Sequence, residues 1–328
     1  MTRLHQTQAW RANDEATRKR VRHFRIVLAL VVIVPPSILA SVNGGRPTQL
    51  NRYRAVRVHY SPLNKMIMSV RINGQRANLL VDTGASQVMV DADAASSFGI
   101  RPSQGRMEYI RSTKINGQKL PVGFAQTFTA GNMSFGSVFV TLRNSSRSDG
   151  GNARVDGVLG LDVLTKYNAV INCRTKLIFF KVTSTGQTHL SNIAASEKFT
   201  RVPLRQEESG ALTAPCSIHG QPARLLVDTG AFVTTFTDAV LRSLGIASKP
   251  TNLSARFPGG TSRKVNAAQI NDLKVGDFKV PPGKFGVAAL PNFAPRQGSG
   301  RMFGILGMDT LYNCDAIIDL DGMNLFLK

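Results

Sequence analysis

The chain has 328 residues, a formal net charge of +21 and 42% hydrophobic residues. This length allows one large or two medium domains, and the hydrophobic and glycine contents exclude a generally disordered protein. Residues 1–57 hold eleven Lys or Arg and only two acidic residues, and the remaining excess of positive charge is scattered. No basic stripe with aromatic residues and no recognisable nucleic-acid motif is present, so we expect no nucleic-acid partner.

The N-terminus carries a predicted membrane segment. The basic run RKRVRHFR (18–25) precedes seventeen uncharged residues, 26–42. Seventeen residues lie at the lower limit for a helix that spans the hydrocarbon core, and Pro35 and Pro36 interrupt the run. A cleaved signal peptide with Ile26–Val34 as its apolar core is the alternative. The long basic leader and the lack of an A-x-A site favour an uncleaved transmembrane helix over residues 26–42.

Positive residues before an apolar run tend to stay in the cytoplasm. Residues 1–25 are therefore expected to form a basic cytoplasmic tail, and the rest of the chain is expected on the far side of the membrane, periplasmic or extracellular. Residues 43–57, polar and basic with Gly and Pro, are interpreted as a tether.

The body of the chain is an internal repeat. Three segments of the first half return in the second half, shifted by 146 or 147 residues: INGQRANLLVDTGA (72–85) as IHGQPARLLVDTGA (218–231), GVLGLDVL (157–164) as GILGMDTL (304–311), and AVINCRTKLIFFK (169–181) as AIIDLDGMNLFLK (316–328). The Ser/Thr-rich stretch 183–196 separates them as a linker. We therefore predict two similar lobes, residues 58–182 and 197–328.

Each repeat is predicted to be mainly β. Two strands joined by a turn at Asn73-Gly74 lead into the first Asp-Thr-Gly. A short helix then covers residues 91–100 and is closed by Gly99; its counterpart covers 237–246 and is closed by Gly245. Glycine-bearing hairpins follow around Asn116-Gly117 in the first half and Pro258-Gly259-Gly260 in the second. A Leu-Gly pair, a short helix and a closing strand complete each unit.

Asp82 and Asp228 are the candidate catalytic residues. Each follows an apolar strand, Leu79–Val81 or Leu225–Val227, that carries its carboxyl to a poorly hydrated place. One buried acid alone is costly, whereas two that meet across a pseudo-twofold axis can share a proton. The ionised member can then take a proton from a water that attacks a peptide carbonyl, while the protonated member stabilises the oxyanion.

The residues beside the aspartates have predicted supporting roles. The hydroxyls of Thr83 and Thr229 can hydrogen-bond across the axis and hold the two loops in register. Gly84 and Gly230 allow backbone amides to approach the carboxylates.

The repeated LLVDTGA, followed about eighty residues later by Leu-Gly-x-Asp, resembles the retropepsin-like aspartic proteases, including their bacterial members. Those proteases are normally homodimers in which each subunit gives one Asp-Thr-Gly loop, and the tandem arrangement resembles such a dimer fused into one chain, as in pepsin-like enzymes. The resemblance covers residues 58–328. It implies two acid-protease lobes related by pseudo-twofold symmetry, with flaps at Gly117 and at Pro258, Gly259 and Gly260 that close over the substrate.

The resemblance also implies that Val158-Leu159-Gly160 and Ile305-Leu306-Gly307 pack beneath the active-site loops. Ala85 and Ala231 stand where many pepsin-like enzymes have Ser or Thr, whose hydroxyl lowers the pKa of the carboxylate. Alanine cannot do this, so we expect a weakly acidic to near-neutral optimum. The first hairpin lacks the glycine-rich tip of the second, so the second flap is expected to dominate.

Retroviral members usually carry an acid two residues after the Gly of the triplet and an Arg just after Leu-Gly. Ser86 and Leu161 occupy these places in the first half, and Phe232 and Met308 in the second. Both partners of the ion pair are absent together, so no buried charge is left without a partner.

Other residues suggest no further chemistry. Cys173, Cys216 and Cys314 show no CxxC spacing and are expected to be buried thiols, with one disulfide as the alternative. The five histidines form no cluster. Asp162 and Asp309 begin helices and are interpreted as N-caps. No metal, nucleotide or organic cofactor is implied.

The sequence thus predicts a membrane-anchored aspartic endopeptidase that acts on polypeptides, with envelope or membrane proteins as expected substrates, and that works as a monomer. A catalytically silent, membrane-tethered peptide-binding module with the same fold is the alternative. A second alternative is that each half pairs with a half of another chain.

Overall fold

The computed structural model describes residues 50–61, 64–107, 111–115, 118–144, 154–183, 190–256, 262–290 and 301–328. They belong to one compact unit, Gly45–Lys328. The predicted membrane segment 26–42 and the predicted flap tips lie outside the described residues. Within the described ranges, no helix is both long and apolar enough to cross a bilayer.

The first lobe is mainly β, as predicted. Its elements are β1 (Tyr53–Tyr60), β2 (Met66–Ile72), β3 (Gln75–Val81), β4 (Met89–Asp91), α1 (Ala92–Ala95), the 3-10 helix η2 (Ser96–Phe98), β5 (Ser112–Ile115), β6 (Gln118–Ala130), β7 (Met133–Arg143), β8 (Gly157–Leu159), α3 (Leu161–Lys166), β9 (Val170–Asn172) and β10 (Leu177–Lys181).

The second lobe repeats this series after helix α4. Its elements are α4 (Leu190–Ser196), β11 (Thr200–Pro203), β12 (Arg205–Gln206), β13 (Leu212–Ile218), β14 (Gln221–Val227), β15 (Thr235–Phe236), α5 (Asp238–Ser243), β16 (Ser248–Arg256), β17 (Ser262–Ile270), β18 (Lys274–Val275), β19 (Phe278–Lys279), β20 (Gly283–Val287), β21 (Met302–Leu306), α6 (Met308–Asn313), β22 (Ile317–Asp319) and β23 (Asn324–Leu327).

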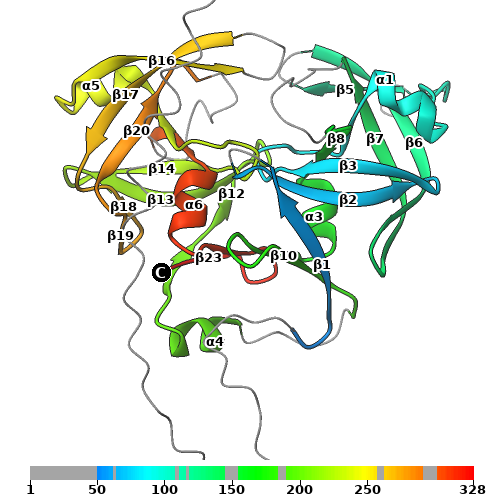
Figure 1. The fold of residues 1–328 in the computed structure, drawn as a ribbon, viewed down its shortest axis with the longest axis horizontal. Helices are drawn as coiled ribbons and strands as arrows, with labels where there is room; N and C mark the ends of the chain where they lie inside the picture. The colour runs from blue at the N-terminus through cyan, green and yellow to red at the C-terminus, as the bar shows by residue number, and fades with distance from the viewer. Residues whose placement is uncertain are drawn as a thin grey trace, which may run out of the picture. The chain divides into compact units, whose positions relative to one another are not determined.

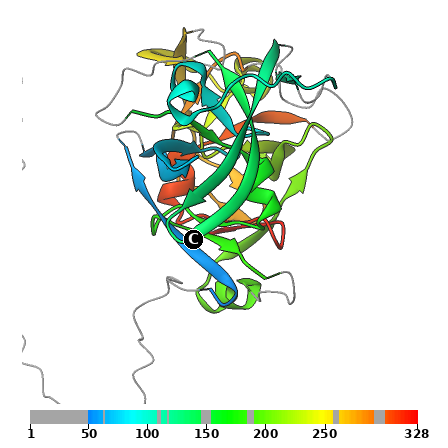
Figure 2. The ribbon, with the colours of Figure 1, turned by 90° about the vertical axis from the view of Figure 1, so that its right-hand side faces the viewer.

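The strand orders of the two lobes correspond. The first lobe has the order β2-β3-β8-β4-β7-β6-β5, and the second has β13-β14-β21-β15-β20-β17-β16. In Figure 1 the lobes lie on either side of a central line on which the ends of β3 and β14 meet. The side view in Figure 2 shows β6 and β7 curving together over the first lobe. The internal repeat in the sequence is therefore a repeat of architecture.

The turns that open each repeat also correspond. Asn73 and Gly74 have φ values of 49° and 82°, and His219 and Gly220 have 50° and 71°. Positive φ at two successive residues is the geometry of a tight hairpin turn, which Asn-Gly favours. The predicted helix ends are confirmed as well, because Gly99 and Gly245 have φ values of 67° and 70°.

A six-stranded sheet joins the lobes beneath the Asp-Thr-Gly loops. Its strand order is β11-β23-β22-β9-β10-β1, so each lobe gives three strands. At its centre β9 and β22 pair antiparallel, and Ile171 lies opposite Ile318, its own counterpart in the repeat. Both side chains are fully buried. The pseudo-twofold axis therefore runs between these two residues, and the lobes share a hydrogen-bonded core.

Two segments differ from the boundaries expected from the sequence. The tether proposed for 43–57 contains the start of β1, where Val56 and Val58 are buried and the strand pairs with β10. The linker proposed for 183–196 contains α4, whose Leu190 and Ala194 are buried one helical turn apart. Alternation in β1 directs Val56 and Val58 into the main core, and the i, i+4 spacing in α4 produces an apolar face that packs on the six-stranded sheet.

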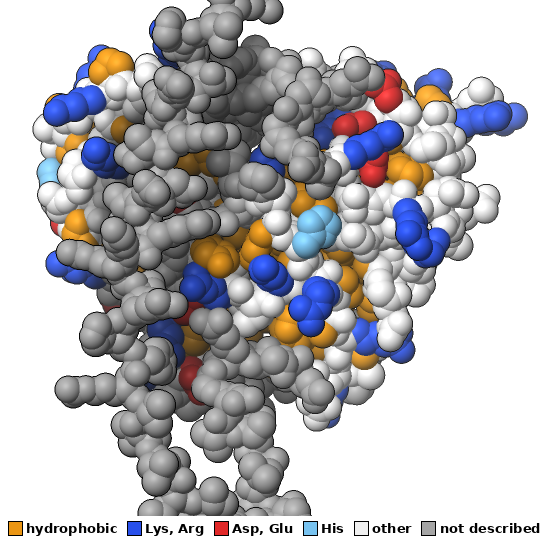
Figure 3. Space-filling view, in the orientation of Figure 1, with side chains coloured by type: hydrophobic (Ala, Val, Ile, Leu, Met, Phe, Trp, Pro, Cys, Tyr) orange, Lys and Arg blue, Asp and Glu red, His pale blue; other side chains and the backbone are white. Residues whose placement is uncertain are grey.

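The three cysteines are free and buried, as expected. Figure 3 shows one face of the molecule, on which the visible Lys and Arg side chains are spread over both lobes and form no continuous stripe.

Replacing Ile171 or Ile318 with alanine is expected to lower the free energy of unfolding by about 2–5 kcal/mol, because each substitution leaves a cavity at the contact between lobes. Chemical denaturation of the variants measures this loss. Val182→Ala is the control, because Val182 is 43% exposed and its truncation should change the free energy by less than about 0.5 kcal/mol. Equal effects at all three positions would contradict a shared core at the axis.

Candidate active site

Asp82 and Asp228 occupy matching places at the ends of β3 and β14. The Asp82 amide donates to Leu159 O at 3.1 Å, and the Asp228 amide donates to Leu306 O at 3.1 Å. These acceptors end β8 and β21, which run parallel to β3 and β14. The Val-Leu-Gly and Ile-Leu-Gly segments thus lie beside the two loops and fix where each aspartate leaves its strand.

Glycines in β8 and β21 allow another strand to cross closely. A Cβ added to Gly157 would lie 2.1 Å from Met89 O, and one added to Gly304 would lie 2.0 Å from Thr235 O. Any side chain at these places would push away the strand that follows the aspartate loop. The two glycines of the repeated sequence therefore set the return path of each loop.

The two carboxyl groups meet at the pseudo-axis and hydrogen-bond to each other. Gly84 and Gly230 permit this approach. A Cβ on Gly84 would lie 2.6 Å from the Asp228 Cγ, and one on Gly230 would lie 2.3 Å from the Asp82 Cγ. Both aspartates remain partly exposed. The two halves thus bring their aspartates together at the axis.

Each carboxylate also accepts two amides of its own loop. Asp82 Oδ1 accepts from Gly84 N at 2.8 Å and from Ala85 N at 3.1 Å. The corresponding bonds to Asp228 Oδ1 come from Gly230 N at 2.8 Å and Ala231 N at 3.0 Å. These bonds hold Oδ1 of each carboxyl against the backbone of its own loop.

Thr83 and Thr229 bind the loops to each other. Thr83 Oγ1 accepts from Thr229 N at 3.0 Å and donates to Val227 O at 2.7 Å. Thr229 Oγ1 accepts from Thr83 N at 3.1 Å and donates to Val81 O at 2.8 Å. Both threonines are buried, so the four bonds are shielded from water. The supporting role predicted for these hydroxyls agrees with this arrangement.

The electrostatics of the pair favour one shared proton. Burial raises the pKa of Asp82, and the hydrogen bond with Asp228 and the loop amides oppose that rise. Burial raises the pKa of Asp228 well above its usual range, and the negative charge of Asp82 raises it further. Two carboxylates in contact cannot both ionise at low cost, so one proton stays on the pair as pH rises.

Asp162 and Asp309 do not act as N-caps, contrary to the interpretation from sequence. The N-cap positions are Gly160 and Gly307, and each aspartate is the second residue of its helix. Asp162 Oδ2 accepts from Val88 N at 3.0 Å, and Asp309 Oδ1 accepts from Thr234 N at 2.7 Å. The turn after each Asp-Thr-Gly leaves an amide without a strand partner, and the helix aspartate supplies the acceptor.

One polar group near the site could not be assigned from the sequence. The Thr141 hydroxyl donates to Gln87 Oε1 at 2.9 Å, and Gln87 Nε2 donates to the Thr113 hydroxyl at 3.5 Å. Gln87 therefore links the loop after Asp82 to β7 and to the hairpin strand β5. The second lobe has Val233 at the matching place, which cannot form these bonds. The only signal in the sequence is this difference within the repeat.

The comparisons with known proteins agree with the geometry. A family model described as aspartyl protease matches residues 68–163 and 214–310, which together make up more than half of the chain. Each matched segment contains one Asp-Thr-Gly loop.

This chain belongs to the aspartyl protease family.

Among solved structures, the chain is similar to an aspartic proteinase from Irpex lacteus, with a TM-score of 0.49 and 15% identity. That similarity covers 84% of this chain and 96% of the other. No curated protein matches the chain at the level of sequence.

The remaining predicted site residues of this aspartyl protease lie outside the described part. They are Gly117, Pro258, Gly259 and Gly260, at the tips of the two hairpins. The hairpin strands themselves are described: β5 pairs with β6, and β16 pairs with β17. Among the described residues, no group of three or more His, Cys, Asp or Glu side chains has the arrangement of a metal site.

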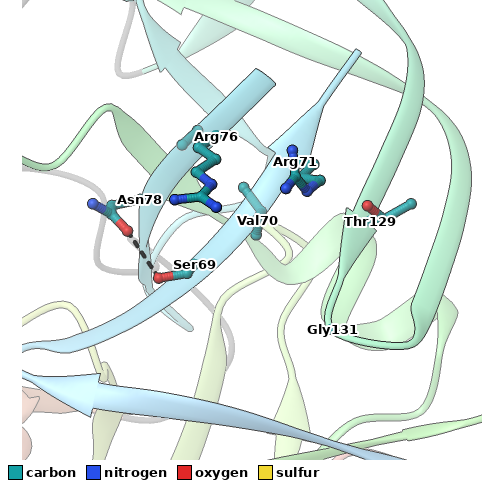
Figure 4. A pocket seen from close by; sticks show the side chains of 8 residues that line it. Ser69, Val70, Arg71, Arg76, Asn78, Thr129 and Gly131 are labelled. Atoms are coloured by element: carbon teal, nitrogen blue, oxygen red, sulfur yellow. Dashed lines mark hydrogen bonds between the residues drawn. The ribbon is translucent and has the colours of Figure 1, made fainter. Parts of the chain in front are cut away.

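A separate pocket of about 500 Å³ lies at β2, β3 and the end of β6 (Figure 4). Ser69 Oγ donates to Asn78 Oδ1 at 3.0 Å within it. Its lining is Ser69, Val70, Arg71, Arg76, Ala77, Asn78, Thr129 and Gly131. No residue of either Asp-Thr-Gly loop belongs to this lining, so the aspartate pair, and not this pocket, is the candidate active site.

Replacing Thr83 with valine is expected to lower the free energy of unfolding by roughly 2–4 kcal/mol, because the amide of Thr229 and the carbonyl of Val227 would lose their buried partner. Chemical denaturation measures the change. Thr83→Ser keeps the hydroxyl and is the matched control. If the valine variant were as stable as the serine variant, the hydrogen bonds across the axis would not hold the loops together.

Asp228→Asn is expected to stabilise the protein at pH 7. A carboxyl with a raised folded pKa keeps a proton in the folded state that the unfolded state releases, so stability falls as pH rises from about 3.9, the usual pKa of Asp, through the raised value. Asparagine stays neutral and avoids this loss, which is about 1.4 kcal/mol for each unit by which the pKa is raised.

Denaturation midpoints between pH 3 and pH 8 test this expectation. The advantage of Asp228→Asn over the wild type should shrink toward pH 3, where the carboxyl is protonated in both states. Asp93→Asn, at an exposed acid of α1, is the control for removal of one negative charge. A variant no more stable than the wild type at pH 7 would contradict a raised pKa of Asp228 in the folded protein.

Proposed function

We propose that this protein is an endopeptidase that hydrolyses peptide bonds with a water activated between Asp82 and Asp228. The observation that carries the proposal is the close approach of two carboxyl groups supplied by equivalent loops, each packed against the glycine of the opposite Asp-Thr-Gly. Such a pair holds a base and an acid within reach of one bound water.

The pair performs both halves of the reaction. The ionised carboxylate takes a proton from the water, whose oxygen attacks the peptide carbonyl carbon. The protonated carboxyl hydrogen-bonds to the carbonyl oxygen and gives it the proton as negative charge develops. When the tetrahedral intermediate collapses, a proton passes to the amide nitrogen, the C–N bond breaks, and the pair returns to its singly protonated state.

The surrounding bonds support this cycle. The loop amides of Gly84, Ala85, Gly230 and Ala231 hold the carboxyl planes fixed, so little reorganisation is needed when charge moves between the two groups. The raised pKa of Asp228 keeps the acid protonated to higher pH. We expect activity to fall when this acid loses its proton, so the raised pKa extends activity toward higher pH, in the direction expected from the alanines after each triplet.

The monomer supplies the complete pair in this proposal. Both aspartates come from one chain, and the six-stranded sheet with three strands from each lobe supports pairing within that chain. We also propose that residues 26–42 anchor the enzyme in a membrane with the protease body translocated, and that envelope or membrane polypeptides are its substrates. The basic leader and the uncharged run in the sequence support this location.

Asp82→Asn and Asp228→Asn are each expected to lower kcat/KM for an unfolded protein substrate by at least roughly 10³-fold, because each removes one proton-transfer group. The full chain, purified in a nonionic detergent, would be assayed from pH 3 to pH 8. Asp93→Asn is the matched control and should keep wild-type activity.

The outcomes separate the candidate functions. Activity that survives both substitutions would refute the assigned pair. A folded wild-type protein that binds the substrate and leaves it uncut at every pH would favour the silent peptide-binding module. Specific activity that stays constant on hundredfold dilution of the enzyme supports the monomer, whereas loss on dilution would indicate pairing between chains.

A further inference from the structure

The two hairpins that lie over the lobes carry charge of one sign. Residues 111–122, which contain β5 and the start of β6, and residues 248–265, which contain β16 and the start of β17, hold seven Lys or Arg and no Asp or Glu. In Figure 1 both hairpins stand on the side of the molecule opposite the six-stranded sheet. The aspartate pair, which supplies the charge used in the proposed mechanism, has the opposite sign to the hairpins.

Strand register places the two hairpins at the ends of matching rows, where a row is a series of residues paired across neighbouring strands. In the first lobe Met89 pairs with Thr141, and Thr141 pairs with Val122. In the second lobe the same row runs from Thr235 through Gly286 to Ala267 and ends at Lys249. Arg111 directly precedes β5, whose first residue pairs with Pro121, beside Val122. Arg111 and Lys249 therefore stand at corresponding corners of the two lobes.

Each row faces the loop that carries the aspartate. In the first lobe Thr141 and Thr113 both contact the Gln87 side chain. In the second lobe a Cβ on Gly286 would lie 3.2 Å from a methyl group of Val233, the counterpart of Gln87. Arg111 and Lys249 are exposed at the outer ends of these rows. The cations thus end the rows that begin beside the aspartate loops, one in each lobe, and we take these outer ends as the rim of the candidate active site.

Positive charge at the outer ends of both rows has a consequence for ligands. It raises the local concentration of ligands of the opposite sign and accelerates their association.

We propose that the substrates are polypeptides with acidic side chains on both sides of the scissile bond, and that Arg111 and Lys249 select one side each. The inference rests on the proposed peptidase function. A peptide that crosses the aspartate pair lays one arm over each lobe. From β15 to β16 the row spans three strand spacings, about 14 Å, which an extended peptide covers in roughly four residues. The acidic positions are therefore expected roughly four residues from the cut.

The test uses the full chain in nonionic detergent and a set of peptides with one shared centre. The eight central residues come from a site that the enzyme cuts in an unfolded protein. Glu or Lys is placed beyond them at the N-terminal end, at the C-terminal end or at both. The peptide with Glu at both ends is expected to have kcat/KM at least tenfold above the peptide with Lys at both ends at low ionic strength. The ratio should fall toward one in 0.5 M salt.

Charge reversal assigns the ends to the two lobes. Arg111→Glu should abolish the preference for Glu at one end of the peptide, and Lys249→Glu should abolish it at the other. Lys274→Glu with Lys279→Glu is the control, since both are exposed on the β18–β19 hairpin outside the rows described above. This control pair should keep the full preference while changing the net charge as much as the double variant Arg111→Glu with Lys249→Glu.

Equal cleavage of the Glu and Lys peptides, or an equal loss of preference in the control pair, would overturn the inference. In that case Asp82→Asn still decides the proposed function separately, because its loss of activity does not depend on the charge of the substrate.

Discussion

The structure depends on keeping two carboxyl groups in contact in a place that water reaches poorly. Burial raises the pKa of each carboxyl, so each ionises only at a cost in free energy. The two groups also repel each other when both are charged. The fold offsets this cost with four loop amides and with the hydroxyls of Thr83 and Thr229, which pair with backbone groups across the axis. The six-stranded sheet beneath prevents the lobes from separating under that repulsion.

Duplication explains how one chain meets such a demand. A pseudo-twofold axis turns every bond that one loop makes into a second bond made by the other, so the four threonine bonds need only one local solution. The close approaches at Gly84 and Gly230 follow the same logic, because each glycine leaves room for the opposite aspartate. The two halves must therefore match in the residues near the axis, and they can differ in residues farther from it.

The sequence contained most of the site because the site lies where that constraint is strongest. The repeated LLVDTGA and Leu-Gly segments identified the aspartate pair, the threonines and the supporting strands. The start of β1 was missed because its apolar positions are few and become meaningful only through pairing with β10. Helix α4 was missed because its apolar face is short and becomes meaningful only through the sheet that it covers. Asp162 and Asp309 were misassigned because helix position suggests a cap, whereas their acceptor role depends on a loop seventy-odd residues away.

The differences between the two lobes allow the site to distinguish the two directions of a peptide, which a symmetric site cannot do. A peptide has a direction, so a fully symmetric site would bind it equally in both orientations. Gln87 forms hydrogen bonds where its counterpart Val233 cannot, and β16 with nine residues extends further than β5 with four. These departures lie away from the axis, where they leave the aspartate pair undisturbed. In the proposed endopeptidase, proton transfer would therefore be shared between the halves, while the two halves would contact different parts of the peptide.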